Sequence, residues 1–122
     1  MNAIQFTRFH HLLLSVPLGA LEAARAFYGG VLGLPEAPGP HPKATIWYLV
    51  GGIELHIQED PAPLGPRSKR HPAFEVADAA GARRALEAQG VAIEPASDLA
   101  GRQRFFVRDP FENRLEMLQL GS

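Results

Sequence analysis

The stretch HLLLSVPLGALEAARAFYGGV, residues 11–31, holds a short apolar strand, a helix at residues 20–28 and two glycines that end the helix. The same layout returns in HPAFEVADAAGARRALEAQGV, residues 71–91, and the two stretches share five identical residues among 21 aligned pairs. Ordinary residue frequencies of about 5 to 8% would give roughly one or two identities. The matches include the first strand residue, the strand end and the glycine after the helix. This placement indicates an internal duplication.

The second helix, at residues 79–89, is predicted to begin after Asp78 as its N-cap and to end before Gly90. Each helix is followed by short β-like segments. In the first half Gly51 and Gly52 form a tight turn between two of them. The expected segments are residues 44–50 and 52–57 in the first half, and 91–95, 102–108 and 114–120 in the second.

A Pro-rich patch at residues 35–43 stands where the first half would have an edge strand, so we expect that strand to be short or missing. The order of elements predicts an α+β fold of two βαβββ modules that form a concave mixed sheet. The modules span about 1–60 and 68–122 of a single domain. A Pro-rich, charged loop at 59–70 joins them, and Arg67, Lys69 and Arg70 in it are expected to be solvated.

Composition limits the classes of function. The 122 residues are enough to bury a core, 46% of them are hydrophobic, and the net charge is −1. The chain has no excess of basic residues of the kind that would indicate nucleic-acid binding. It also has no apolar run long enough to predict a membrane span. There is no cysteine for disulfide or thiol chemistry, and MNAIQFTRFH lacks the layout of a signal peptide. We expect a soluble cytoplasmic protein.

The duplication also pairs residues that carry chemistry. His11 matches His71, and beyond the helix the register slips by two, so that IEL (53–55) matches LEM (115–117) and Glu54 matches Glu116. If the two modules pack around a pseudo-twofold axis, two imidazoles and two carboxylates converge. Such a set suits a divalent metal ion such as Zn²⁺, Ni²⁺, Mn²⁺ or Fe²⁺.

The neighbouring histidines leave alternatives open. In GGIELHI, residues 51–57, Glu54 and His56 share one strand face and the three aliphatic residues share the other. That polar face either lies in water or lines a concave sheet with metal ligands, and His56 either replaces Glu54 as a ligand or touches substrate. We expect His10 to point away from His11, at the surface or in an interface, and His41 to lie in solvent.

The sequence resembles the vicinal oxygen chelate superfamily, which includes glyoxalase I, bleomycin- and fosfomycin-resistance proteins and extradiol dioxygenases. The resemblance covers nearly the whole chain. It implies that His11, His71 and Glu116 bind metal and that Glu54 takes the place of the extra carboxylate of glyoxalase I, which ligates metal and moves a proton. The motifs that carry it are HHLLLSV (10–16), ARAFYGGVLGLP (24–35), IELHI (53–57), HPAFEV (71–76) and FFVRDPFENRLEML (105–118).

The ligand set leads to three candidate functions. With Glu54 as fourth ligand or base and Glu116 as a catalytic ligand, a glyoxalase-type lyase or isomerase acts on a small substrate that chelates the metal through neighbouring oxygens. Without Glu54, two histidines and one carboxylate suit a non-haem Fe²⁺ ring-cleaving dioxygenase. The third candidate is a resistance-type protein that binds a drug without turnover; such relatives generally lose the ligands that this chain keeps. Small relatives also suggest a homodimer.

Two further expectations concern the second half and the cavity wall. Arg102, Arg104, Phe106 and Arg108 alternate onto one strand face, a cationic wall that suits an anionic molecule. Trp47 and Tyr48 point to opposite faces, one of them toward the cavity. In the turn that usually reads DP-x-G-N the chain has Glu112 instead of glycine, so the positive φ is expected to move to Asn113. No residue marks a glutathione site.

Overall fold

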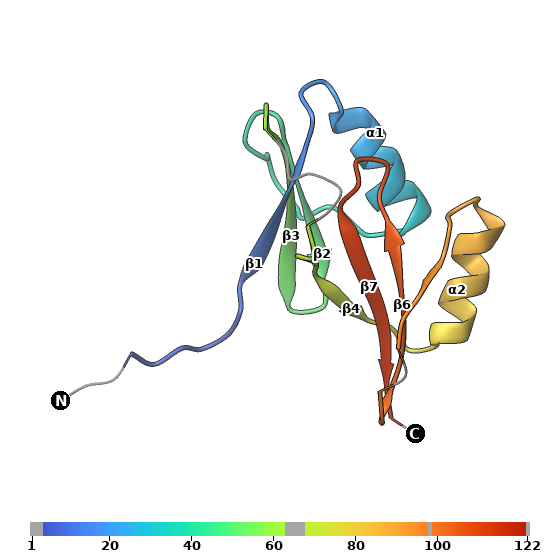
Figure 1. The fold of residues 1–122 in the computed structure, drawn as a ribbon. Helices are drawn as coiled ribbons and strands as arrows, with labels where there is room; N and C mark the ends of the chain where they lie inside the picture. Colours follow the sequence, from blue (N-terminus) through green and yellow to red (C-terminus); the bar gives the residue numbers. More distant parts are fainter. Residues whose placement is uncertain (1–3, 63–67, 98, 122) are drawn as a thin grey trace.

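A computed structural model describes residues 4–62, 68–97 and 99–121 of the chain. Its two halves have matching element orders (Figure 1). The first half contains β1 (His11–Val16), α1 (Leu21–Arg25), the π-helix η1 (Ala26–Val31), β2 (Thr45–Val50) and β3 (Ile53–Glu59). The second contains β4 (Ala73–Glu75), α2 (Ala79–Ala88), β5 (Glu94–Pro95), β6 (Arg102–Arg108) and β7 (Arg114–Leu120).

The strands form two mixed sheets. Sheet A has the order β1-β3-β2, with β3 parallel to β1 and antiparallel to β2. Sheet B has the order β4-β7-β6-β5, with β7 parallel to β4 and antiparallel to β6. In both halves the last strand therefore lies beside the first. This confirms the predicted α+β class with its repeated βαβββ layout, although the sheet is divided into two rather than continuous.

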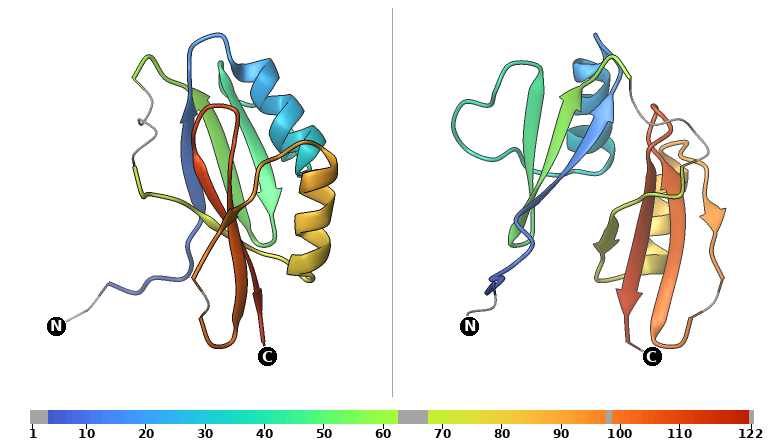
Figure 2. Two further views of the ribbon diagram at one scale, coloured as in Figure 1. Left: turned by 45° about the vertical axis from the view of Figure 1, so that its right-hand side comes forward. Right: turned by 60° about the vertical axis from the view of Figure 1, so that its left-hand side comes forward.

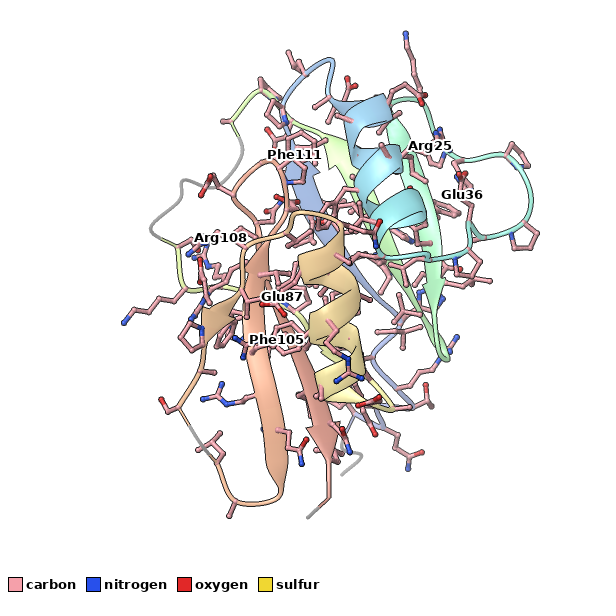
Figure 3. All side chains as sticks on the ribbon, turned by 90° about the vertical axis from the view of Figure 1, so that its right-hand side faces the viewer. Arg25, Glu36, Glu87, Phe105, Arg108 and Phe111 are labelled. Carbon is pink, nitrogen blue, oxygen red and sulfur yellow. The ribbon has the colours of Figure 1, made fainter. Side chains whose placement is uncertain are left out.

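The first half has three paired strands in the described part of the chain, as the Pro-rich patch predicted. Its missing edge strand is reduced to one antiparallel bridge between Glu36 and Tyr48. Arg25 of α1 forms an ion pair with Glu36, which ties this segment to the helix (Figure 3). Prolines at residues 35, 38, 40 and 42 remove the backbone donors that a longer strand would need.

The first helix is longer than predicted, because Gly29 and Gly30 do not end it. It continues through η1 to Val31, and the backbone N–H of Leu32 donates to the carbonyl of Phe27 at 2.9 Å. The chain turns off only at Gly33, whose φ is +72°. Gly29 lies next to Tyr48, and a Cβ there would be in ordinary van der Waals contact with the Tyr48 hydroxyl oxygen at 3.6 Å.

The ends of α2 follow the sequence. The Asp78 carboxylate accepts a hydrogen bond from the backbone N–H of Gly81 at 3.0 Å, which satisfies one of the free donors of the first turn. Gly90 has a φ of +81° and takes the chain out of the helix. Both predictions for this helix are confirmed, with the helix one residue shorter than expected.

The core lies between the sheets and the helices. Helices α1 and α2 cover the same side of the two sheets and leave the opposite faces without helical cover (Figures 1 and 2). One apolar cluster spans both halves and includes Tyr28 and Tyr48, as well as Phe105 beside α2 (Figure 3). No helix among the described residues is long and apolar enough to cross a membrane.

The turn between β6 and β7 locks the halves together through Asp109, which is 3% exposed. Its carboxylate accepts hydrogen bonds from the Tyr28 hydroxyl at 2.6 Å and from the Asn113 backbone N–H and side-chain amide at 2.8 Å. The Asn113 amide also donates to the carbonyl of Ser15 in β1 at 2.9 Å. The turn is thus a polar joint between the two modules.

The expected shift of positive φ onto Asn113 is wrong, because Glu112 itself has a φ of +75°. The Asn113 side chain and N–H are both engaged with Asp109, so this residue is held in place by its hydrogen bonds. The left-handed conformation falls on the exposed Glu112, whose carbonyl accepts from Arg108 at 2.9 Å.

Candidate functional site

The uncovered face of sheet A carries the first group of candidate ligands. The strand register places His11 opposite Glu54, and His56 opposite Trp47. Leu55, between the two polar residues of β3, is buried in the core on the other face. The alternation predicted from GGIELHI is therefore present, with its polar side on the face that no helix covers.

Four aromatic rings form a continuous stack across this face. The ring of His56 lies between His11, at a centroid distance of 4.1 Å, and Trp47, at 4.6 Å. His41 follows on the far side of Trp47 at 5.6 Å. Its side chain is 11% exposed, so the expectation that His41 lies in solvent is wrong: the Pro-rich segment folds back over β2 and carries the ring onto Trp47.

Trp47 is the member of the Trp47–Tyr48 pair that faces the candidate site, and Tyr48 is fully buried against the helix side. His10 is exposed, as expected, but its ring lies edge-on to that of His11 and the two Nδ1 atoms are 3.0 Å apart. His10 is therefore next to the stack and not remote from it.

Glu54 and His56 form a close pair within sheet A. The Nε2 atom of His56 lies 2.8 Å from Glu54 Oε1. This hydrogen bond is the main reason that the pKa of Glu54 lies below its ordinary value. Glu54 is therefore a carboxylate at neutral pH, with one oxygen held by its neighbour on the strand.

The second group lies on the uncovered face of sheet B. His71 stands two residues before β4, and its Nε2 atom is 3.0 Å from Glu116 Oε1 on β7. The Nδ1 atom of His71 lies 2.8 Å from the Lys69 carbonyl, which can only accept a hydrogen bond. Nδ1 therefore carries a proton, and Nε2 is the atom free to bind a ligand.

The pair presents one nitrogen and one oxygen of the kinds that metal ions bind in proteins. With the proton on Nδ1, a neutral His71 turns the lone pair of Nε2 toward the carboxylate of Glu116, which is 6% exposed. Two acceptors 3.0 Å apart are bridged either by a proton, held on Nε2 or on the carboxyl, or by a bound metal ion. One imidazole nitrogen and one carboxylate oxygen are ordinary ligands of Zn²⁺, Ni²⁺, Mn²⁺ and Fe²⁺.

The four candidate ligands do not meet at one point in a single chain. Among the described residues, no group of three or more histidine and acidic side chains is arranged to hold a metal ion. Instead, His71 meets Glu116 on sheet B, whereas His11 and Glu54 are joined through His56 on sheet A. Each sheet thus supplies one part of a possible metal site.

The arginines predicted for β6 line the Glu116 side of sheet B. Phe106 lies opposite Glu116 in the register, and Arg104 Nη1 is 3.5 Å from Glu116 Oε2. Arg114 was not among the residues singled out from the sequence. This residue lies two positions before Glu116 on β7 and therefore shares its face. Its guanidinium carbon lies 3.6 Å from the centroid of the Phe106 ring.

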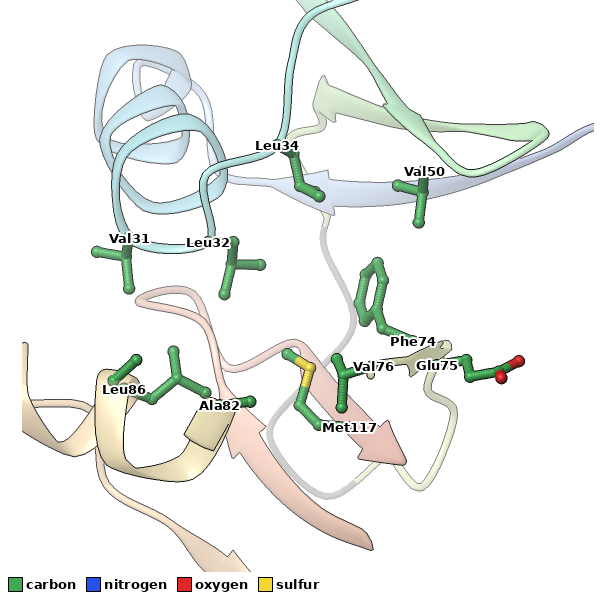
Figure 4. Close-up of a pocket in the computed structure, with 11 residues that line it drawn as sticks. Val31, Leu32, Leu34, Val50, Phe74, Glu75, Val76, Ala82, Leu86 and Met117 are labelled. Carbon is green, nitrogen blue, oxygen red and sulfur yellow. The ribbon is translucent and has the colours of Figure 1, made fainter. Parts of the chain in front are cut away.

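A separate apolar pocket of about 230 Å³ lies on the helix side (Figure 4). Leu32 and Leu34 border it from the first half, and Val76 and Met117 from the second. None of the candidate ligands lines it. The pocket and the His–Glu pairs are therefore distinct features of the structure.

Comparison with known proteins agrees with this fold. The model of the Glyoxalase/Bleomycin resistance protein/Dioxygenase superfamily matches residues 8–117. The chain belongs to this superfamily. No match was found among curated proteins.

Several solved structures are similar to the chain. A glyoxalase family protein from Bacillus anthracis is 32% identical over 98% of each chain, with a TM-score of 0.85. The lactoylglutathione lyase from Agrobacterium tumefaciens is 21% identical, with 94% of this chain and 95% of that chain covered and a TM-score of 0.74. A fosfomycin resistance protein from Listeria monocytogenes is 20% identical, with 93% and 90% covered and a TM-score of 0.72.

Proposed function

We propose that the protein is a metal-dependent lyase or isomerase of the glyoxalase type, acting on a small substrate that chelates the metal through two neighbouring oxygens. His11, His71 and Glu116 would hold the ion, with Glu54 as a fourth ligand or base. The metal, when bound, would act as a Lewis acid and stabilise negative charge that develops on the substrate oxygens.

The observation that carries this proposal is the His71–Glu116 pair. Lys69 fixes the tautomer of His71, and the strand pairing of β4 with β7 holds Glu116 beside it. Glu116 is 6% exposed, and its Oε2 atom contacts Arg104 at 3.5 Å, whereas its Oε1 atom faces His71. The pair would thus offer one nitrogen and one oxygen to a metal ion before any substrate arrives.

Glu54 is suited to move a proton. It is a carboxylate at neutral pH, and the hydrogen bond with His56 fixes it on the same face as His11. In a lyase or isomerase reaction, Glu54 would take a proton from the carbon next to the chelating oxygens and return it to the neighbouring position. His56 would hold the carboxylate in position during this transfer.

We further propose that two copies of the chain build the site together. The His71–Glu116 pair and the His11–Glu54 group lie on different sheets, and neither alone has the ligands that a stable ion needs. In a homodimer, sheet A of one protomer would face sheet B of its partner, so that each site receives one group from each copy.

A second candidate, a non-haem Fe²⁺ dioxygenase, is favoured by one observation. Glu54 is already bonded to His56, so it can remain outside the metal shell. His11, His71 and Glu116 then form the set of two histidines and one carboxylate used by oxygenases. The identity of the bound metal separates this candidate from the first.

The test is metal content, measured by mass spectrometry on protein purified without a metal-chelating tag. Wild type is compared with the double variant His71→Ala, Glu116→Ala, and with Glu87→Gln on α2 as a control that leaves both sheets unchanged. We expect near-stoichiometric metal in wild type and in the control, and none in the double variant. Ni or Zn supports the isomerase, and Fe supports the dioxygenase. A wild type that stays empty after loading with each ion would refute both.

Sharing of the site between chains has its own test. His11→Ala and Glu116→Ala each damage one ligand group, and the two variants are unfolded and refolded as a mixture. If the site is shared, each mixed dimer has one site that contains both substitutions and one site that contains neither. The mixed dimers should therefore bind metal in one of their two sites. If the mixture holds no more metal than the separate variants, the site lies within one chain.

A further inference from the structure

The uncovered face of sheet B has more positive charge than its carboxylates neutralise. Arg104 contacts Glu116, and Arg108 contacts Glu94 at 3.3 Å. Within the described part of the chain, Arg102 and Arg114 have no carboxylate within 4.0 Å. The face beside the proposed metal ligand Glu116 is therefore cationic.

Two of these guanidinium groups meet at one aromatic ring. Arg114 lies 3.6 Å from the centroid of Phe106 and Arg104 lies 5.5 Å from it. Like charges gathered around one ring repel each other, and the ring face offsets only part of this cost. An anion that contacts both arginines would relieve the repulsion.

Arg104 is also incompletely satisfied. Its side chain is 16% exposed, and its Nε atom is buried with no hydrogen-bond partner among the described residues. Its contact with Glu116, at 3.5 Å, uses Nη1 at the long limit of a hydrogen bond. A buried donor without an acceptor costs free energy, so this guanidinium has capacity for a further oxygen ligand.

We propose that Arg104 and Arg114, both next to the Phe106 ring, form a subsite for an oxyanion group of the substrate. This inference rests on the proposed function, because the subsite adjoins Glu116 and would orient a substrate bound at the metal. The substrate would carry a carboxylate, phosphate or phosphonate group in addition to its two chelating oxygens. A guanidinium fork binds such groups with two parallel hydrogen bonds, whereas a neutral substrate would leave Arg114 unpaired.

The experiment titrates inorganic phosphate and acetate, in separate runs, into the metal-free and the Zn²⁺-loaded protein and follows binding by calorimetry. Arg114→Gln is the main variant because Arg114 does not contact the ligand carboxylates, and Arg83→Gln on α2 is the control that removes an equal charge elsewhere. We expect either probe to bind roughly tenfold more weakly to Arg114→Gln and unchanged to Arg83→Gln. Arg114→Lys should recover part of the loss, since it restores charge without the fork.

Metal content of the same samples separates this inference from the proposed function. Metal-holding protein that binds neither probe would overturn the subsite alone, as would equal weakening in Arg114→Gln and Arg83→Gln. Metal-free protein that still binds a probe through Arg114 would keep the subsite and count against the metal-dependent reaction. An Arg114→Gln variant that keeps its metal but no longer binds phosphate or acetate supports both the subsite and the proposed function.

Discussion

The two buried tyrosines allow a matched test of the joint between the modules. Tyr28 and Tyr48 are both 0% exposed, but only the Tyr28 hydroxyl donates to Asp109. Tyr28→Phe removes a hydrogen bond to a buried carboxylate, which is worth about 2 kcal/mol. At about 2.1 cal/mol/K per residue the 122-residue chain has an unfolding entropy of roughly 0.26 kcal/mol/K, so Tm should fall by about 8 °C.

Tyr48→Phe is the control. Its hydroxyl is buried without a hydrogen-bond partner among the described residues, so its removal should leave the free energy of unfolding unchanged or raise it by about 1 kcal/mol. Both variants are measured by urea and thermal unfolding at one protein concentration, because a dimer would make Tm depend on concentration. Equal destabilisation by the two changes would refute the assignment of Asp109 as the joint.

Three further predictions concern stability. Burial raises the pKa of Tyr48 to about 12, and burial with the neighbouring Asp109 raises the pKa of Tyr28 well above its ordinary value. Tyrosines of the unfolded chain ionise near pH 10 while those of the folded chain do not, so stability should be complete below about pH 10 and fall as pH rises toward 12, as read from urea midpoints. Glu112→Gly should raise the free energy of unfolding by about 0.5 to 1 kcal/mol, because φ of +75° is strained for glutamate. Asp78→Ala should lower it by about 1 kcal/mol through loss of the cap on α2, measured by urea unfolding.

Each of these has a contradicting result. A double Tyr28→Phe, Tyr48→Phe variant that loses stability with pH as steeply as wild type would show that other groups cause the alkaline transition. A loss of stability in Glu112→Gly would mean that the glutamate side chain supports the turn. An unchanged Asp78→Ala variant would mean that water replaces the cap at no cost.

Local sequence signals predicted the elements that local interactions determine. Asp78 and Gly90 bracket α2 because a cap and a left-handed glycine act over one turn. The repeat pairs His11 with His71 and Glu54 with Glu116, and the structure brings one histidine and one glutamate of that set, His71 and Glu116, within 3.0 Å of each other, since β4 and β7 pair in parallel. Their role as metal ligands stays a prediction.

Features that depend on distant packing were not predictable in this way. The first helix continues past Gly29 and Gly30 as a π-helix, which no local sequence signal indicated. His41 reaches the ring stack because a Pro-rich segment folds over β2. The separation of the ligand groups depends on how the two modules pack, which no local pattern specifies.

The ring stack also gives the protein an internal optical reporter. Trp47 is the only tryptophan in the sequence, and it lies flat against His56, the residue that is hydrogen-bonded to Glu54. Displacement of the His56 ring when an ion or a ligand enters that face changes the surroundings of the indole and should change its emission intensity. Occupancy of the sheet A face can thus be followed by fluorescence in the unlabelled chain, with no second tryptophan to obscure the signal.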